Sequence, residues 1–344
     1  MTDLENKQVL VTGGCGSIGS ELVERLLDYE EPAVVRVFDN DEAGLFDLKT
    51  TLDSDRLRFL LGDVRDRNRL EMAMEDIDVV FHAAALKHVG LNEYNPFETV
   101  QTNALGTQNL IRAAMEENVE AFVTISTDKA SNPTSVMGAT KLLSERLTIA
   151  ANTYKGEQNT EFGCVRFGNV FGSSGSVVPL FLDQISDGGP MTVTNREMTR
   201  FIMPIEEATD LVFDAYERME GGETFVLKMP VFRLMDLAEA MRTEYAPQFG
   251  YDPSEVEIHK TGKRPGERIH EKLISKDEIQ QTIELDEMFV ITPLIEDCGY
   301  DPLDYESRNS LDAEYTSADV DPLSKSEIIA MIENTSAYET MVEG

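Results

Sequence analysis

A glycine-rich turn near the start of the chain places the strongest constraint on the fold. The short apolar run Gln8–Thr12 predicts a strand, and residues from Ser17 to Tyr29 have the pattern of a helix. Between them stands the sequence Thr12-Gly13-Gly14-Cys15-Gly16-Ser17-Ile18-Gly19. Glycines at this place allow a tight turn and a close backbone approach to a ligand, and the free N–H groups of the helix start bind phosphate. The turn therefore indicates a dinucleotide-binding unit.

Strands and helices alternate through the first half of the chain. Further strand-like runs occur at Val34–Phe38, Arg56–Leu61, Asp78–His82 and Ala121–Ser126, and the last two follow helical segments. Such alternation predicts a parallel sheet with helices on both faces. We therefore expect an α/β fold with a doubly wound, Rossmann-type parallel sheet.

The second half of the chain has a looser pattern, which predicts a smaller lobe at the carboxyl edge of the sheet. Turns are expected at Gly188-Gly189-Pro190 and Gly221-Gly222. We expect a dinucleotide-binding domain over residues 1–176, with contributions from later segments, and a substrate-binding lobe over residues 177–300. Residues 301–344 are expected to form an acidic tail with a short capped helix at Leu323–Ile332.

The residues that follow the first strands indicate which dinucleotide binds. Asp39 ends the second strand twenty residues after Gly19, where an acid accepts a hydrogen bond from the ribose 2′-hydroxyl. An acid there disfavours the extra phosphate of NADP, so the expected cofactor is NAD. The alternative, a structural turn with a capping Asp, explains the combined strand, glycines, helix and acid less well. The candidate cofactor-binding residues are Thr12, Gly13, Gly16, Ser17, Ile18, Gly19, Asp39, Asp63, Val64, Ala83 and Ala84.

The charge of the chain excludes whole classes of partner. There are 64 acidic against 30 basic side chains, a formal net charge of −34, which repels nucleic acid and anionic membranes. The acids are spread along the chain, which favours a solvated surface suited to high salt over an acidic binding face. Any phosphate must be held by local devices, and we expect a small positive cleft inside an acidic shell.

Cysteine usage and hydropathy indicate a soluble cytoplasmic protein. Cys15, Cys164 and Cys298 are odd in number and far apart, which favours reduced thiols. The first residues are unlike a signal peptide, and no apolar run approaches the roughly 18 residues of a membrane span. The four histidines and three cysteines lack metal-ligand spacing, so no metal site is expected.

Several longer motifs make the chain resemble a known family. They are Thr124–Ala130 with Asn132-Pro133 and Val136–Lys141, together with His82–Val89, Arg166–Val170, Gly172–Pro179 and Arg264–Glu267. They resemble the extended short-chain dehydrogenase/reductases that modify nucleotide sugars. Within these, the chain is similar to the UDP-N-acetylglucosamine 4,6-dehydratases of the polysaccharide-biosynthesis branch, from about Lys7 to about Leu273.

The resemblance implies a hydride transfer from sugar C4 to NAD, loss of water across C5 and C6, and hydride return to C6. The elimination needs a base and an acid, and the adjacent Lys129 and Asp128 are of the right types. We expect burial beside NAD and Lys141 to lower the pKa of Lys129, and burial to favour a protonated Asp128. The two form a coupled pair whose roles could exchange. Without the motif, an exposed Asp–Lys ion pair would be the better interpretation.

The chain departs from the superfamily at one catalytic position. A Tyr usually stands four residues before the helical Lys, but here Met137 precedes Lys141, and a thioether cannot exchange a proton. A branch of the dehydratase family resembles this chain in having Met there, typically in large membrane-anchored members whose product usually keeps its C5 configuration. This chain is expected to work without such segments. The alcohol proton would pass through Thr127, Asp128 or Lys129, while Lys141 holds the nicotinamide ribose.

The same motifs imply a nucleotide-sugar site. Arg200 and Arg264 are the candidates for clamping the diphosphate, because a guanidinium fits phosphate oxygens bidentately, and Glu267 for the uridine ribose. The competing interpretation is surface pairing with the many acids. Lys87 and Asn103 match motif positions near the cofactor, with a surface lysine and a helix-capping amide as the alternatives. The remaining candidate substrate-binding residues are Ser126, Asn169, Ser176, Val177 and Thr192.

We therefore predict an NAD-dependent 4,6-dehydratase of a UDP-N-acetylhexosamine, with UDP-N-acetylglucosamine as first candidate, serving surface glycan or glycoprotein synthesis. The first alternative is a UDP-sugar 4-epimerase on the same scaffold, which would have no use for the Asp128–Lys129 pair. The second, suggested by Met137, is a catalytically silent protein that binds NAD or a nucleotide sugar. The segments Asn95–Asn118 and Lys141–Tyr154 fall where the superfamily builds a four-helix dimer interface, so a homo-oligomer is expected.

Overall fold

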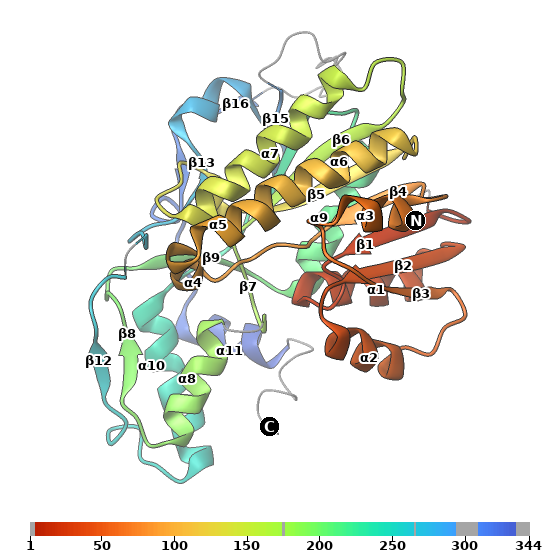
Figure 1. Ribbon diagram of the computed structural model, residues 1–344. Coiled ribbons are helices and arrows are strands. Elements are labelled where there is room, and N and C mark those ends of the chain that lie inside the picture. Colours follow the sequence, from red (N-terminus) through yellow and green to blue (C-terminus); the bar gives the residue numbers. More distant parts are fainter. Residues whose placement is uncertain (1–3, 174–175, 265, 294–308, 335–344) are drawn as a thin grey trace.

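A large, mostly parallel sheet forms the centre of the molecule (Figure 1). The computed structural model describes residues 4–173, 176–264, 266–293 and 309–334. Ten strands lie in the order β16-β14-β15-β10-β6-β5-β4-β1-β2-β3. They are β1 (Gln8–Thr12), β2 (Val34–Asp39), β3 (Leu57–Leu61), β4 (Val79–His82), β5 (Ala121–Thr127), β6 (Glu161–Phe167), β10 (Thr224–Leu227), β14 (Thr282–Glu284), β15 (Met288–Ile291) and β16 (Asn309–Ser310). In this spatial order, the strands from β10 through β6, β5, β4, β1 and β2 to β3 are all parallel. At the β10 edge, β15, β14 and β16 extend the sheet by antiparallel pairing. The order 3-2-1-4-5-6 confirms the expected Rossmann-type sheet.

Helices cover both faces of this sheet, as its apolar strands require. Side chains alternate along β1, so that Val9 and Val11 face one apolar cluster while Leu10 faces another. The first cluster is covered by α1 (Ser17–Tyr29), α2 (Glu42–Thr51) and α9 (Ile205–Arg218). The second is covered by α3 (Arg67–Met74), α6 (Thr107–Glu116) and α7 (Val136–Tyr154). The sheet is therefore buried on both sides, and its loops at the carboxyl ends of the strands are left to form a site.

The helical segment expected around Asn95–Asn118 is built from successive pieces. It comprises α5 (Pro96–Thr99), the π-helical η1 (Val100–Gly106) and α6, and it follows α4 (Val89–Tyr94). The short 3₁₀ turn η2 (Asp128–Ala130) joins β5 to the loop before α7. This turn carries two of the candidate catalytic residues.

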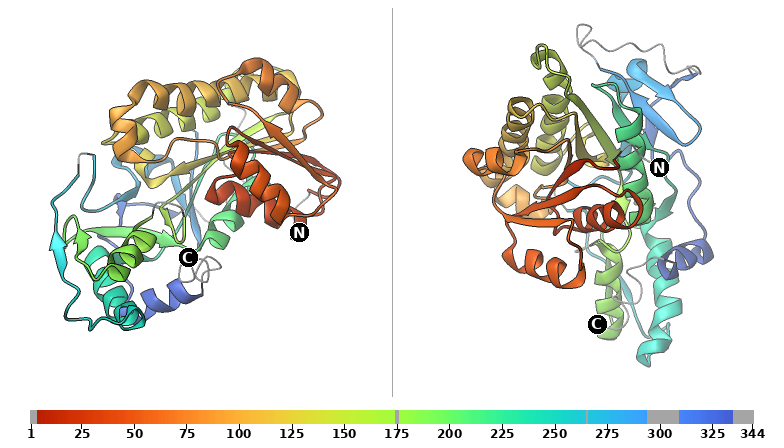
Figure 2. Two further views of the ribbon diagram at one scale, coloured as in Figure 1. Left: turned by 60° about the horizontal axis from the view of Figure 1, so that its bottom comes forward. Right: turned by 90° about the vertical axis from the view of Figure 1, so that its right-hand side faces the viewer.

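A smaller part with its own apolar core lies beyond the carboxyl edge of the sheet. It contains α8 (Val177–Ser186), α10 (Leu234–Tyr245), η3 (Ala246–Phe249) and α11 (Lys325–Glu333), whose apolar side chains share one cluster. Figures 1 and 2 show α8, α10 and α11 gathered at the end of the molecule away from β1–β3. The short strands toward this part are β7 (Asn169–Val170), β8 (Met191–Val193), β9 (Thr199–Met203), β11 (Val231–Arg233) and β12 (Ile258–Lys260). The paired strands β13 (Lys272–Ile274) and β17 (Tyr315–Thr316) pack instead on the apolar cluster of the large sheet, and η4 (Lys276–Gln281) follows β13.

The chain crosses between the two parts several times. After residue 177, α9, β10 and β14–β16 return to the large sheet, so the boundaries proposed at residues 176 and 300 stay a prediction. The segment expected to be a tail contributes β16, β17 and α11 to the fold. The capped helix near Leu323–Ile332 is confirmed, because Ser324 and Glu327 form a capping box at the start of α11. Cys298 lies outside the described residues. None of the helices described is long and apolar enough to cross a membrane.

Candidate functional site

A cavity of about 630 Å³ opens at the carboxyl ends of β1, β4 and β5, between the large sheet and the smaller part. It is lined by cofactor and substrate candidates alike, among them Ser17, Ala83, Lys129, Asn169 and Thr192. The charged side chains of its wall are Lys87, Lys129, Lys141, Arg200 and Arg264 against the carboxylate Glu267. The positive cleft inside an acidic chain is thus present. A larger, more open hollow of about 1220 Å³ lies at the amino ends of β5 and β6 and contains none of the candidates.

The glycine turn forms one end of this cavity and is tightly built. Gly13 has a φ of 70°, and a Cβ there would lie 2.5 Å from the Ala84 backbone nitrogen. A Cβ on Gly19 would lie 2.1 Å from the Gly13 carbonyl oxygen. Only glycine fits such approaches, which hold the start of α1 directly behind the turn. Asp39 accepts a hydrogen bond from the Cys15 backbone N–H at 2.9 Å, so its carboxylate lies beside this turn.

Several candidates lie behind the cavity wall instead of on it. Thr12 is buried and its hydroxyl pairs with His82 Nδ1 at 2.8 Å. Asp63 is bound by Arg65 at 2.6 Å. Asn103 accepts from the Leu86 N–H at 2.8 Å and donates back to the Leu86 carbonyl, so it fixes the loop that carries Lys87. Asp39, Val64, Ala84 and Asp128 likewise do not line the cavity.

The candidate catalytic residues form one hydrogen-bonded group. Asp128 is fully buried, and its Oδ1 accepts from the Thr127 hydroxyl and from Lys129 Nζ, both at 2.9 Å. Thr127 and Lys129 line the cavity, so Asp128 lies behind the two groups that can touch a ligand. The Lys129 side chain is 26% exposed. The pair is therefore not the exposed surface ion pair of the alternative interpretation, because its carboxylate is buried.

The expected lowering of the Lys129 pKa is wrong. Burial acts to lower it, but the carboxylates of Asp128 and Glu271 outweigh burial and raise the pKa above its usual range. The cation that opposes them is Arg200, not Lys141. Near neutral pH, Lys129 is therefore an ammonium in this structure.

Lys141 and Met137 occupy the positions that the motif predicts. Lys141 is buried and donates from Nζ to the Ile125 carbonyl at 2.6 Å, and burial lowers its pKa to about 8 against the opposing effect of Glu145. Met137 lies one turn earlier on α7, is 4% exposed and lines the cavity. An apolar thioether thus takes the wall position beside Lys141.

Arg200 is placed differently from its expected role. Its Nη1 donates to the Thr199 and Ile269 carbonyls, its Nη2 donates to the Arg268 carbonyl, and its Nε lies 3.6 Å from Glu271 Oε1. These bonds occupy the guanidinium fork, which leaves it poorly suited to bind a diphosphate bidentately. Arg264 is exposed at the cavity wall and remains the better candidate.

The other substrate candidates are brought together on the wall. Asn169 donates to the Phe201 carbonyl at 2.9 Å, Thr192 is bonded to Gln184, and Glu267 accepts from the Arg264 N–H at 2.9 Å. The hydroxyls of Ser126 and Ser176 are buried at the cavity without a hydrogen-bond partner among the described residues. Such unpartnered groups fit a polar ligand, because a buried hydroxyl without a partner is costly.

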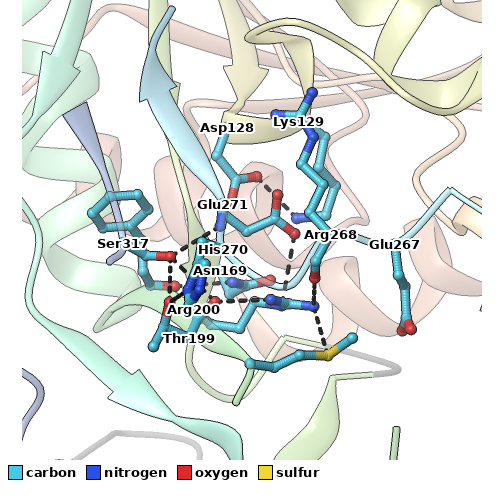
Figure 3. A network of polar contacts seen from close by, with 12 residues as sticks. Asp128, Lys129, Asn169, Thr199, Arg200, Glu267, Arg268, His270, Glu271 and Ser317 are labelled. Carbon is cyan, nitrogen blue, oxygen red and sulfur yellow. Dashed lines mark hydrogen bonds and ion pairs between the residues drawn. The ribbon is translucent and has the colours of Figure 1, made fainter. Parts of the chain in front are cut away.

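Sequence reasoning missed Glu271. This residue precedes β13 and is 4% exposed, and its carboxylate lies beside Asp128, Lys129 and Arg200 (Figure 3). No motif or periodicity marks it, since it is one acid among 64. Its position depends on the fold, which brings the segment before β13 behind η2.

Comparison with known proteins gives a consistent picture. Residues 9–293 match the polysaccharide biosynthesis protein family. The chain is 57% identical over 84% of its length to an uncharacterized membrane protein of Methanocaldococcus jannaschii, covering 86% of that protein. It is 39% identical over 96% of its length to a UDP-N-acetylglucosamine 4,6-dehydratase (inverting) of Campylobacter jejuni, covering 99% of it. It is 36% identical over 96% of its length to a UDP-glucose 4-epimerase of Rickettsia bellii, covering 96% of it.

Solved structures agree with the fold. Pen from Bacillus thuringiensis superimposes with a TM-score of 0.89 at 42% identity, over 97% of this chain and 99% of that one. A dTDP-glucose 4,6-dehydratase from Streptomyces venezuelae with NAD bound superimposes with a TM-score of 0.67 at 25% identity, over 76% of this chain and 86% of that one.

Proposed function

The chain belongs to the polysaccharide biosynthesis protein family of extended short-chain dehydrogenase/reductases, and from this we propose that it is an NAD-dependent UDP-N-acetylglucosamine 4,6-dehydratase. Its scaffold is that of the nucleotide-sugar dehydratases and epimerases. The observation that favours dehydration is the buried Asp128 carboxylate, bonded to both Thr127 and Lys129 at the cavity wall. Two proton-exchanging groups beside the substrate are what an elimination needs and what an epimerase does not use.

The residues at the glycine turn fit NAD. The turn leaves room only for backbone, and the start of α1 offers its N–H groups to a pyrophosphate. Asp39 beside the turn suits an adenosine ribose with a free 2′-hydroxyl and repels a 2′-phosphate. The bound cofactor would supply hydride uptake from C4 and hydride return to C6. Lys141 would bind the nicotinamide ribose from the wall beside Met137.

The chain's own residues can carry the protons of the reaction. The Thr127 hydroxyl donates a hydrogen bond to Asp128 Oδ1. Thr127 Oγ1 can therefore receive the proton of the C4 hydroxyl while it passes its own proton to Asp128. In the resting state, the proton that the departing C6 hydroxyl requires is on Lys129. Asp128 holds one proton at a time, so the C4 proton would first leave it through Thr127 for the water of the cavity. Transfer of the Lys129 proton to Asp128 over 2.9 Å then leaves a neutral amine that can take the C5 proton, while Asp128 returns the transferred proton through Thr127 to the departing C6 hydroxyl. The pair thus supports the exchange of roles that sequence analysis left open.

One incubation separates the candidate functions. Purified protein is given NAD and UDP-N-acetylglucosamine in high salt, and the product is followed by mass spectrometry and proton NMR. Loss of one water with a new C6 methyl signal supports the dehydratase. An unchanged mass with a galacto-configured product replaces it by the epimerase, and binding without turnover indicates a silent protein. The same spectra report whether C5 is retained or inverted.

Replacing Gly19 by alanine is expected to abolish NAD binding. The added Cβ would lie 2.1 Å from the Gly13 carbonyl, so the turn must open and the start of α1 must move. We expect a loss of about 1–3 kcal/mol in the free energy of unfolding together with the loss of NAD. Calorimetric NAD titration and denaturant unfolding measure both. Gly90→Ala is the matched control, because nothing lies within 4 Å of its Cβ position; equal NAD affinity in the two variants would contradict the assignment.

We also propose that α4, α5 and α7 form a contact between two copies of the chain. Leu91, Tyr94, Phe97 and Leu143 are large apolar side chains that are 46–86% exposed on these helices. Apolar side chains gathered in this way mark interaction surfaces. Phe97→Glu is expected to convert the protein to monomers in light scattering, whereas Phe46→Glu, at an exposed position on α2, is expected to leave the molar mass unchanged.

A further inference from the structure

Glu271 is a carboxylate inside the catalytic group that the proposed chemistry has not used. It is 4% exposed, and its Oε1 lies 3.6 Å from Arg200 Nε. Figure 3 shows the carboxylate beside Asp128 and the end of Lys129. It comes from the segment before β13, whereas Asp128 and Lys129 come from η2 after β5. Two distant parts of the chain therefore place carboxylates around one ammonium.

The backbone of Glu271 is fastened at both its polar groups. Its N–H donates to Ser317 Oγ at 2.9 Å, and its carbonyl accepts from the Ser317 N–H at 2.9 Å. Ser317 Oγ also shares a hydrogen bond of 2.7 Å with Thr199 Oγ1, which joins it to β9. Glu271 is thus held in a fixed place by a segment close to the carboxyl end of the described chain.

Glu271 reduces the excess of positive charge in this group. Lys129 and Arg200 are two cations, and Asp128 alone offers one negative charge. Arg268 also acts on Glu271, and its Nη1 donates to the Ser131 carbonyl in the loop after η2. An unpaired buried charge is costly, so a second carboxylate favours a charged Lys129 beside Arg200.

We propose that Glu271 is a positioning residue of the elimination, which acts with Asp128 to hold the Lys129 ammonium in place beside the substrate. This inference rests on the proposed function. Glu271 does not line the cavity, so it acts through Lys129 and not by touching the sugar. Asp128 alone can then receive the Lys129 proton over 2.9 Å, while Glu271 reduces the excess of positive charge.

Glu271→Gln tests this role, because it keeps the shape of the side chain and removes its charge. With less negative charge near the ammonium, the pKa of Lys129 falls. The limb of the kcat/KM profile that depends on Lys129 is therefore expected to move to lower pH by about one unit, whether Lys129 acts as acid or as base. The chain has only twelve lysines, so ¹³Cε-lysine NMR can follow the same titration without turnover, with Lys129→Arg assigning the signal.

Matched variants separate a positioning role from a merely structural one. Glu223→Gln removes the charge of another buried carboxylate, which accepts from the Glu220 and Gly221 N–H groups, and is expected to leave the limb in place. Glu271→Asp keeps the charge but shortens the side chain by one methylene. The Lys129-dependent limb of its kcat/KM profile is expected to lie between those of the wild type and Glu271→Gln, so this variant tests the inference if Glu271→Gln does not fold. The inference is wrong if neither the Lys129-dependent limb of the kcat/KM profile nor the Lys129 titration shifts in Glu271→Gln. A wild type that forms no 4-keto-6-deoxy sugar instead overturns the proposed function, while the lysine titration still tests Glu271.

Discussion

Lys129→Ala is expected to abolish water loss while NAD stays bound. Lys129 is the ionisable residue of η2 that lines the cavity, and Asp128 lies behind it, hydrogen-bonded to Thr127 and Lys129. Removal of a positioned acid or base lowers the rate by about 10²- to 10⁴-fold. The 4-keto-6-deoxy product should therefore fall to background in proton NMR, with an unchanged NAD affinity in calorimetry.

Two further variants make this result specific. Lys129→Met keeps much of the side-chain volume and is expected to be equally inactive, which excludes lost packing as the cause. Lys228→Ala removes a lysine that pairs with Glu284 at 2.7 Å outside the cavity and is expected to keep wild-type turnover. Near-full activity of both Lys129 variants would show that the elimination does not use this residue.

The parts of the site that could be predicted are those encoded by neighbouring residues. The glycine turn, Asp39 at the end of β2, and Thr127 to Lys129 after β5 each follow a strand that apolar residues mark clearly. Parallel strands bring their carboxyl ends to one edge of the sheet, so these pieces meet by topology alone. The fold class could be predicted on the same basis, whereas the positive cleft was predicted from the need to hold phosphate in a chain of net charge −34.

The parts that could not be predicted depend on contacts between distant segments. The Arg200 fork is occupied by carbonyls of residues 268 and 269, and Glu271 is fixed by Ser317. A sequence pattern carries no information on such pairings when the elements are short and irregular. The predicted direction of the Lys129 pKa shift was wrong because the adjacent Asp128, and after it Glu271, 142 positions away along the chain, outweigh the burial of Lys129.

A second buried charge group lies one turn beyond Lys141 along α7. Arg166 on β6 is 1% exposed and forms bidentate hydrogen bonds of 2.7–3.1 Å with both Glu145 and Glu278. Glu145 lies one turn after Lys141, and Glu278 belongs to η4. One guanidinium thus joins the large sheet, the helix of Lys141 and the segment that follows Glu271.

Arg166→Met is expected to lower the free energy of unfolding by about 3–5 kcal/mol, because it leaves two buried carboxylates without their cation. Denaturant unfolding at neutral pH measures the loss. Arg67→Met is the control: its partners Glu71 and Glu116 are exposed, and a loss of under about 1 kcal/mol is expected. If the two variants lose similar amounts of unfolding free energy, burial of the carboxylates is not what makes the loss in Arg166→Met large.

The pH dependence and a second substitution identify the cause of that loss. Burial acts to raise the pKa of Glu278, but Arg166 and Ser275 outweigh it and lower the pKa below its ordinary value of 4.5. This carboxylate therefore stabilises the wild type above that value, and the contribution is lost as the pH falls through the lowered pKa. In Arg166→Met burial is opposed only by the two Ser275 hydrogen bonds, so protonation of Glu278 in the folded state becomes easier than in the wild type. The difference in the free energy of unfolding between the wild type and Arg166→Met is thus expected to narrow below pH 4.5.

Adding Glu278→Gln to Arg166→Met should recover part of the lost free energy of unfolding at neutral pH. If the effects of the two substitutions are purely additive, the two residues are not coupled.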